Sequence, residues 1–129
     1  MKVFMVNQQA RWVAAFTALS WLGMFVHNSL ELPTLTLLSP ENSLMAFISV
    51  LLFMGWWLTP ARHVAATLLL GLSALHLIGG ALISVLPLGF LPFYPEQTLQ
   101  HYIAHVLYGL AQLPLIAVMA RQSRRSRSA

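Results

Sequence analysis

Long stretches without a charged side chain are the feature that most constrains how this chain can fold. Four such stretches occur, and they lie between Arg11 and Glu31, Glu41 and Arg62, Arg62 and Glu96, and Glu96 and Arg121. Each is mostly apolar, and a helix needs about 20 apolar residues to cross a hydrocarbon core about 30 Å thick. The sequence therefore predicts an all-α, four-helix transmembrane bundle with spans at about 12–31, 41–59, 62–86 and 97–120.

The overall composition agrees with a membrane protein. Only 8% of the residues are charged and 58% are hydrophobic, which leaves far less charge than the surface of a soluble domain carries. The connections between the spans are too short for a soluble domain, so residues 1–120 are predicted to form one membrane domain. Residues 121–129 are expected to be a disordered basic tail. The chain has no cysteine, which excludes disulfides, thiolate metal ligands and cysteine nucleophiles.

The signs of the charges predict an orientation in the cell membrane. If the spans alternate in direction, the cations collect at one end of the bundle, and cations are enriched on the cytoplasmic side of membranes. We therefore expect both termini in the cytoplasm, with Glu31, Glu41 and Glu96 on the outer side. The basic tail RQSRRSRSA is interpreted as a topology signal that contacts anionic lipid headgroups, and not as a segment that binds nucleic acid.

A short repeat marks the expected start of two helices. Residues 40–44 read PENSL and residues 95–99 read PEQTL. Proline is favoured at the first helical position, and a glutamate beside it meets the positive end of the helix dipole. The repeat suggests two helical hairpins related by a parallel internal duplication. For Glu96 the sequence leaves two roles open, a helix start and a ligand, because histidines lie beside it.

Histidines share a helix face with other polar residues in three of the four predicted spans. Ionisable groups inside a span usually face the interior of the bundle. We therefore expect His27, His76 and His105 to converge in the outer half of the bundle, with Glu31, Glu96 and His101 around its outer mouth. The stripe in the fourth span follows the spacing i, i+4, i+7, i+11 and consists of His101, His105, Tyr108 and Gln112.

A metal site is the first cofactor hypothesis. Two histidines at positions i and i+4 can chelate one metal ion from a single helix face. His101 and His105 have this spacing, and so do His27 and Glu31. Imidazole and carboxylate ligands suit zinc, copper or iron. The predicted metal ligands are His27, Glu31, Glu96, His101 and His105.

A b-type haem is the second cofactor hypothesis. Haem needs axial ligands from facing helices and an apolar slot, and His76 and His105 would supply the two imidazoles. Tyr108 and Gln112 continue the stripe beside this site. Glycines at positions 79, 80 and 109 would let the macrocycle approach the helices.

The preferred function is a small non-enzymatic membrane protein with a histidine-rich pocket that binds a metal ion or haem. Such a chain is compatible with an accessory subunit of a membrane-protein partner or with a homo-oligomer. A metal-dependent membrane enzyme and a small proton or cation transporter are the alternatives. A further alternative is a purely structural subunit, in which the polar stripes hydrogen-bond across helices.

Overall fold

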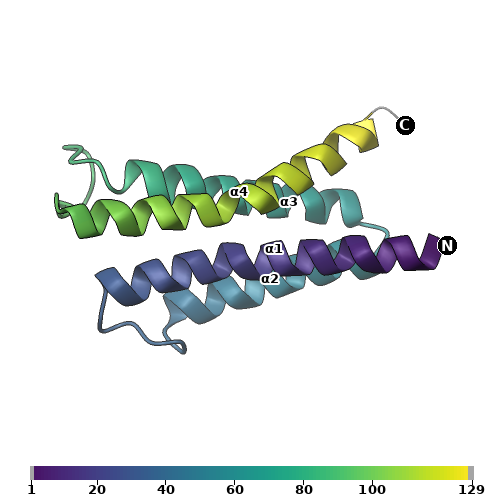
Figure 1. Ribbon diagram of the computed structural model, residues 1–129, viewed down its shortest axis with the longest axis horizontal. Coiled ribbons are helices and arrows are strands. Elements are labelled where there is room, and N and C mark those ends of the chain that lie inside the picture. The colour runs from purple at the N-terminus through teal and green to yellow at the C-terminus, as the bar shows by residue number, and fades with distance from the viewer. Residues whose placement is uncertain (1, 128–129) are drawn as a thin grey trace.

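The computed structural model describes the backbone of residues 2–127 and the side chains of residues 8–124, and within this range the chain is helical and has no strand. The helices are α1 (Lys2–Glu31), α2 (Pro40–Leu58), α3 (Arg62–Leu75) with its π-helical continuation η1 (His76–Ile83), and α4 (Leu99–Arg127). Successive helices run in opposite directions (Figure 1). The start of α1 and the end of α4 therefore share one end of the bundle, here called the termini end. Loops 32–39 and 84–98 share the opposite end, the loop end.

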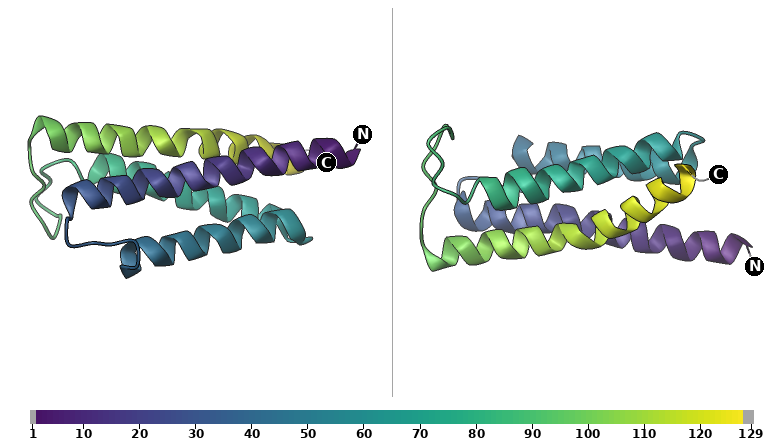
Figure 2. Two further views of the ribbon diagram at one scale, coloured as in Figure 1. Left: turned by 60° about the horizontal axis from the view of Figure 1, so that its bottom comes forward. Right: turned by 90° about the horizontal axis from the view of Figure 1, so that it is seen from above.

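The helices pack in a closed ring. Each helix contacts its neighbour in sequence, and α1 also packs against α4 (Figure 2). Four helical segments are long and apolar enough to cross a membrane, namely Gln8–Glu31, Pro40–Leu58, Arg62–Ile83 and Leu99–Arg124. The prediction of four membrane-compatible helices is therefore confirmed.

Prolines set several of the helix boundaries. Pro33 follows the end of α1, and a residue before proline is disfavoured in the helical conformation. Pro40 occupies the first turn of α2, where its missing N–H removes no helical hydrogen bond, and Glu41 lies in the same turn. Pro60 follows the end of α2. The PENSL segment thus begins a helix as predicted.

The PEQTL segment does not begin a helix in the same way, because α4 starts only at Leu99. The hydroxyl oxygen of Thr98 accepts a hydrogen bond from the backbone N–H of His101 at 3.3 Å, which is the pattern of an N-cap residue. Pro95 and Glu96 therefore lie in the preceding loop. The interpretation of Glu96 as a helix start is wrong, and the two proline–glutamate pairs are not structurally equivalent.

Helix α4 extends beyond the end of the predicted span. Pro114 lies inside it and removes the hydrogen bond to the carbonyl of Leu110, and α4 bends toward its C-terminal end (Figure 1). No glycine or proline follows Pro114 before Arg127, and arginine is both a good helix former and favourable at a helix C-terminus. Residues 121–127 are accordingly helical, whereas the sequence suggested a disordered tail at 121–129, of which 128–129 lie outside the described residues.

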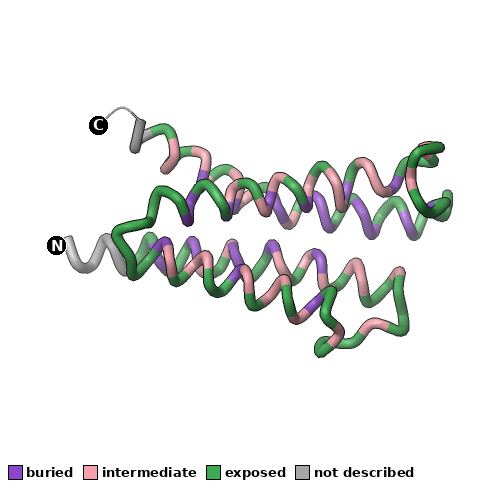
Figure 3. Tube along the Cα trace, turned by 180° about the vertical axis from the view of Figure 1, so that it is seen from behind, coloured by how far each residue is buried: buried purple, intermediate pink, exposed green. Residues whose placement is uncertain are grey.

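Buried residues follow the inner sides of the helices, while residues on the outer sides are exposed (Figure 3). An apolar cluster fills the termini end around Val13, Leu69, Leu115 and Met119. A smaller cluster of Met24, Ala81 and Tyr108 lies toward the loop end. Buried polar side chains lie between the clusters and beyond the second one, and they are Thr17, Ser20, Asn42, Ser49, Ser73, His76, His101, His105 and Gln112.

Candidate functional site

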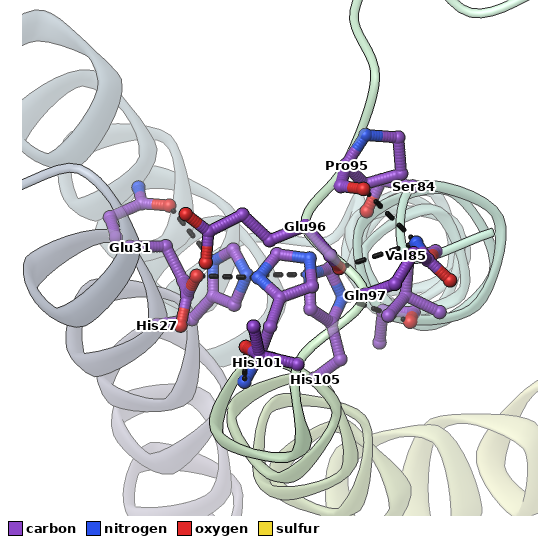
Figure 4. Close-up of polar contacts among 12 residues, drawn as sticks. His27, Glu31, Ser84, Val85, Pro95, Glu96, Gln97, His101 and His105 are labelled. Carbon is purple, nitrogen blue, oxygen red and sulfur yellow. Dashed lines mark hydrogen bonds and ion pairs between the residues drawn. The ribbon is translucent and has the colours of Figure 1, made fainter. Parts of the chain in front are cut away.

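A cavity of about 390 Å³ opens at the loop end between α1, α4 and loop 84–98. We call it the vestibule. Figure 4 shows its polar side chains, which come from all three of these segments. All five residues predicted as metal ligands line it. Its full lining is His27, Glu31, Leu32, Ser84, Phe93, Tyr94, Pro95, Glu96, His101 and His105.

His27 and His105 meet at the floor of the vestibule. Their Nε2 atoms are 3.0 Å apart, and the rings are arranged edge to face with centroids 4.3 Å apart. The Nδ1 atom of His105 lies 3.0 Å from the carbonyl oxygen of Ala81. Ala81 is near the end of η1, where carbonyls have no partner within the helix. Because a carbonyl oxygen only accepts, the Nδ1 atom of His105 carries a proton.

Hydrogen bonds between two side-chain amides determine which atom of Asn28 faces His27. The amide nitrogen of Asn42 donates to the carbonyl of Thr36 at 2.8 Å, and the amide nitrogen of Asn28 donates to Asn42 Oδ1 at 2.8 Å. Turning either amide over would place oxygen against oxygen. The Oδ1 atom of Asn28 therefore faces His27 Nδ1, at 3.3 Å, and accepts its proton.

These hydrogen bonds leave one position between the two histidines to be filled by a cation. When both rings are neutral and both carry their proton on Nδ1, each Nε2 atom has only a lone pair to offer. Two lone pairs then face each other at 3.0 Å in a part-buried place. Such a contact repels unless one positive ion, a proton or a metal ion, lies between the nitrogens.

His101 lines the vestibule and contacts Glu31. Its Nδ1 atom lies within hydrogen-bond distance of the Glu31 carboxylate, and because an ionised carboxylate only accepts, Nδ1 carries a proton. In the neutral ring the Nε2 atom then has a lone pair, and this atom is buried without a hydrogen-bond partner among the described residues. The ring centroid of His101 is 4.5 Å from that of His105. A carboxylate on Nδ1 is the arrangement that orients many metal-binding histidines.

The metal site expected from the sequence is not preformed. Among residues whose side chains the structure describes, no group of three or more histidine, aspartate or glutamate side chains has the arrangement needed to hold a metal ion. His27 and His105 supply two nitrogens that already face each other. A third ligand from His101, Glu31 or Glu96 would require a side chain to move within the vestibule.

The arrangement expected for haem does not fit this bundle. His76 lies outside the vestibule lining, with its ring 6.0 Å from that of Tyr108 and its Nδ1 atom unpartnered in the described structure. A Cβ atom on Gly80 would lie 2.6 Å from the hydroxyl oxygen of Tyr108, and one on Gly109 would lie 3.3 Å from the Cβ of Ala81. These glycines allow side chains to pack directly, so the space expected for a macrocycle is filled.

Gln112, also expected beside a cofactor, joins two helices instead. Its side-chain oxygen accepts a hydrogen bond from the hydroxyl of Ser20, and its amide nitrogen donates to the carbonyl of Ser20 at 3.0 Å. Gln112 is fully buried. The inner part of the polar stripe therefore fastens α1 to α4.

Sequence reasoning missed the roles of Asn28 and Asn42. Asn42 is fully buried although it lies in the first turn of α2, and it also accepts a hydrogen bond from the Trp21 indole through its backbone oxygen. The available signal was weak, since Asn28 is simply the neighbour of His27. Asparagine inside a predicted span is costly without partners, and that cost points to a buried network.

Comparisons with models of known protein families, with curated proteins and with solved structures find no match for this chain. Conclusions about its function therefore rest on the geometry of the vestibule.

Proposed function

We propose that this chain is a small integral membrane protein that binds one divalent transition-metal ion, such as Zn²⁺, at the loop end of its bundle. The observation that carries the proposal is the pair of Nε2 atoms of His27 and His105, which face each other at 3.0 Å while both Nδ1 atoms bond to acceptors. Imidazole nitrogen is a preferred ligand of zinc, copper and iron.

The spacing of the two nitrogens is close to that of a chelating pair. Two nitrogens bound to one tetrahedral zinc ion at 2.0–2.1 Å are roughly 3.3 Å apart. His27 and His105 would therefore have to separate by only about 0.3 Å from their 3.0 Å contact. His101 would turn its free Nε2 atom toward the ion as the third ligand, and Glu31 would orient that ring. The vestibule would leave the fourth position open to water.

The packing of the termini end supports binding at a fixed site over passage of an ion through the bundle. Val13, Leu69, Leu115 and Met119 are almost fully buried there and form a continuous apolar cluster. Beyond Gln112 this cluster offers an ion no ligands, and moving a charge through such a layer is costly.

The proposed orientation places the vestibule on the outer side of the cell membrane. Arg11, Arg62 and Arg121 lie toward the termini end, while the glutamates lie at the loop end. The chain has no cysteine, so single cysteines can be introduced as reporters. Thr34→Cys in loop 32–39 should react with an impermeant thiol reagent in intact cells, and Ala61→Cys should react only after lysis. The reverse pattern would refute the orientation.

Zinc titration of the purified protein tests the proposed metal site. In mild detergent, the full chain stripped with a chelator should bind one Zn²⁺, and His27→Ala and His105→Ala should each lower the affinity at least 100-fold. His63→Ala is the matched control, because His63 is an exposed histidine near the start of α3, at the opposite end of the bundle.

Two results would count against the metal site. Equal losses in His63→Ala and His105→Ala would show adventitious binding to surface histidines. Absence of Zn²⁺, Cu²⁺ and Fe²⁺ binding by the wild-type chain would mean that a proton occupies the position between the imidazoles, and that the histidines act as structural contacts.

A further inference from the structure

Glu96 is held over the vestibule by a loop and not by a helix. It is exposed and lines the vestibule together with Glu31. Figure 4 shows its side chain extending from loop 84–98 across the histidine rings toward Glu31. Two carboxylates are therefore positioned at the mouth of a cavity whose floor consists of imidazoles.

The side chain of Gln97 fixes the backbone that carries Glu96. Its amide nitrogen lies 3.2 Å from the carbonyl oxygen of Val85 and 3.0 Å from that of Pro95. Its side-chain oxygen accepts a hydrogen bond from the hydroxyl of Tyr102. Gln97 thus joins the first and last parts of loop 84–98 to each other and to α4.

His101 provides an independent sign that the vestibule takes a positively charged ligand. Only 8% of this residue is exposed, its Nε2 atom has no partner among the described residues, and its ring lines the same cavity. In the neutral ring this nitrogen is a buried acceptor without a donor, which is costly, and a cation would relieve that cost. Carboxylates at the mouth and lone pairs at the floor match a divalent cation and not an anion.

We propose that Glu96 is the entrance ligand of the vestibule and that Gln97 is the residue that positions it. A hydrated divalent transition-metal ion from the outer water would meet Glu96 and Glu31 first and then pass to His101, His105 and His27. This inference rests on the proposed metal site. Charged groups at the mouth of a cleft raise association rates by about 10- to 1,000-fold, so the effect should appear in the rate of binding.

Stopped-flow measurement of Zn²⁺ association with the full chain in detergent tests the entrance. Glu96→Gln should slow association about tenfold at low ionic strength, and added salt should reduce the difference. Glu41→Gln is the matched control, because Glu41 also lies at the loop end but in the first turn of α2 and outside the vestibule lining. It removes the same charge and should change the rate less than twofold.

Gln97→Ala should slow association in the same direction as Glu96→Gln. If Gln97 acts by positioning Glu96, adding Gln97→Ala to Glu96→Gln should have little further effect, whereas a merely structural role would make the two losses multiply. If circular dichroism shows that Gln97→Ala does not fold, the comparison of Glu96→Gln with Glu41→Gln tests the role of Glu96 without it. Equal Zn²⁺ association rates for those two variants would refute Glu96 as the entrance ligand, whereas binding of one Zn²⁺ per chain would still support the metal site. A wild-type chain that binds no metal would overturn both.

Discussion

The contact between α1 and α4 is so close at Gly23 that even one methyl group should disturb it. A Cβ atom at this position would lie 2.5 Å from the Cβ of Ala111, which is a short side chain without freedom to move away. Restoring ordinary contact at 3.4 Å requires the two helices to part by about 0.9 Å. Overpacking of this kind costs about 1–3 kcal/mol.

The same displacement should reach the vestibule, because His27 lies one helical turn beyond Gly23. If the shift is fully transmitted, the 3.0 Å contact between His27 and His105 grows to about 3.9 Å, which exceeds hydrogen-bond distance. Gly23→Ala should therefore lower both the stability of the bundle and its affinity for Zn²⁺.

Unfolding in increasing sodium dodecyl sulfate, followed by circular dichroism, measures the loss of stability. Gly71→Ala is the matched control, since a Cβ atom at Gly71 would meet no other atom within 4 Å. That variant should be neutral or more stable by up to about 1 kcal/mol, because alanine is the better helix former. If Gly23→Ala and Gly71→Ala behave alike, the described packing of α1 against α4 is wrong.

Three further substitutions test the polar network. Gln112→Leu removes both hydrogen bonds to Ser20 and should cost about 1 kcal/mol in detergent unfolding, and no loss would show that these bonds contribute nothing. Asn42→Leu removes the acceptor of the Asn28 amide, so zinc titration should show about 10- to 100-fold weaker binding. Unchanged affinity would show that the two amides do not orient His27 for the metal. His76→Leu removes a buried nitrogen without a partner, so stability should hold or rise while one Zn²⁺ still binds, and loss of the metal would place His76 in the site.

Features that depend on periodicity could be predicted from the sequence. The charge-free stretches predicted the four helices. The regular spacing of polar residues in the fourth span predicted one buried face of α4, which contains His101, His105, Tyr108 and Gln112. Periodic burial is a local property, because it depends only on 3.6 residues per turn and on which side of the helix meets its neighbours.

Features that depend on distant contacts could not be predicted. The start of α4 depends on Thr98 and on the link from Gln97 to Val85, which lies across the loop. The amide chain from Thr36 to His27 depends on how loop 32–39 folds. The π-helical segment His76–Ile83 departs from 3.6 residues per turn, whereas the sequence pattern assumed an ordinary helix. A membrane-protein partner or a homo-oligomer stays a prediction.

Zinc-edge X-ray absorption of the purified, zinc-loaded protein tests directly whether His27 and His105 share one metal ion. We expect one zinc per chain with at least two imidazole nitrogens at about 2.0–2.1 Å, and loss of imidazole scattering in His105→Ala. A zinc ion surrounded only by oxygen, or an imidazole signal unchanged in His105→Ala, would contradict it.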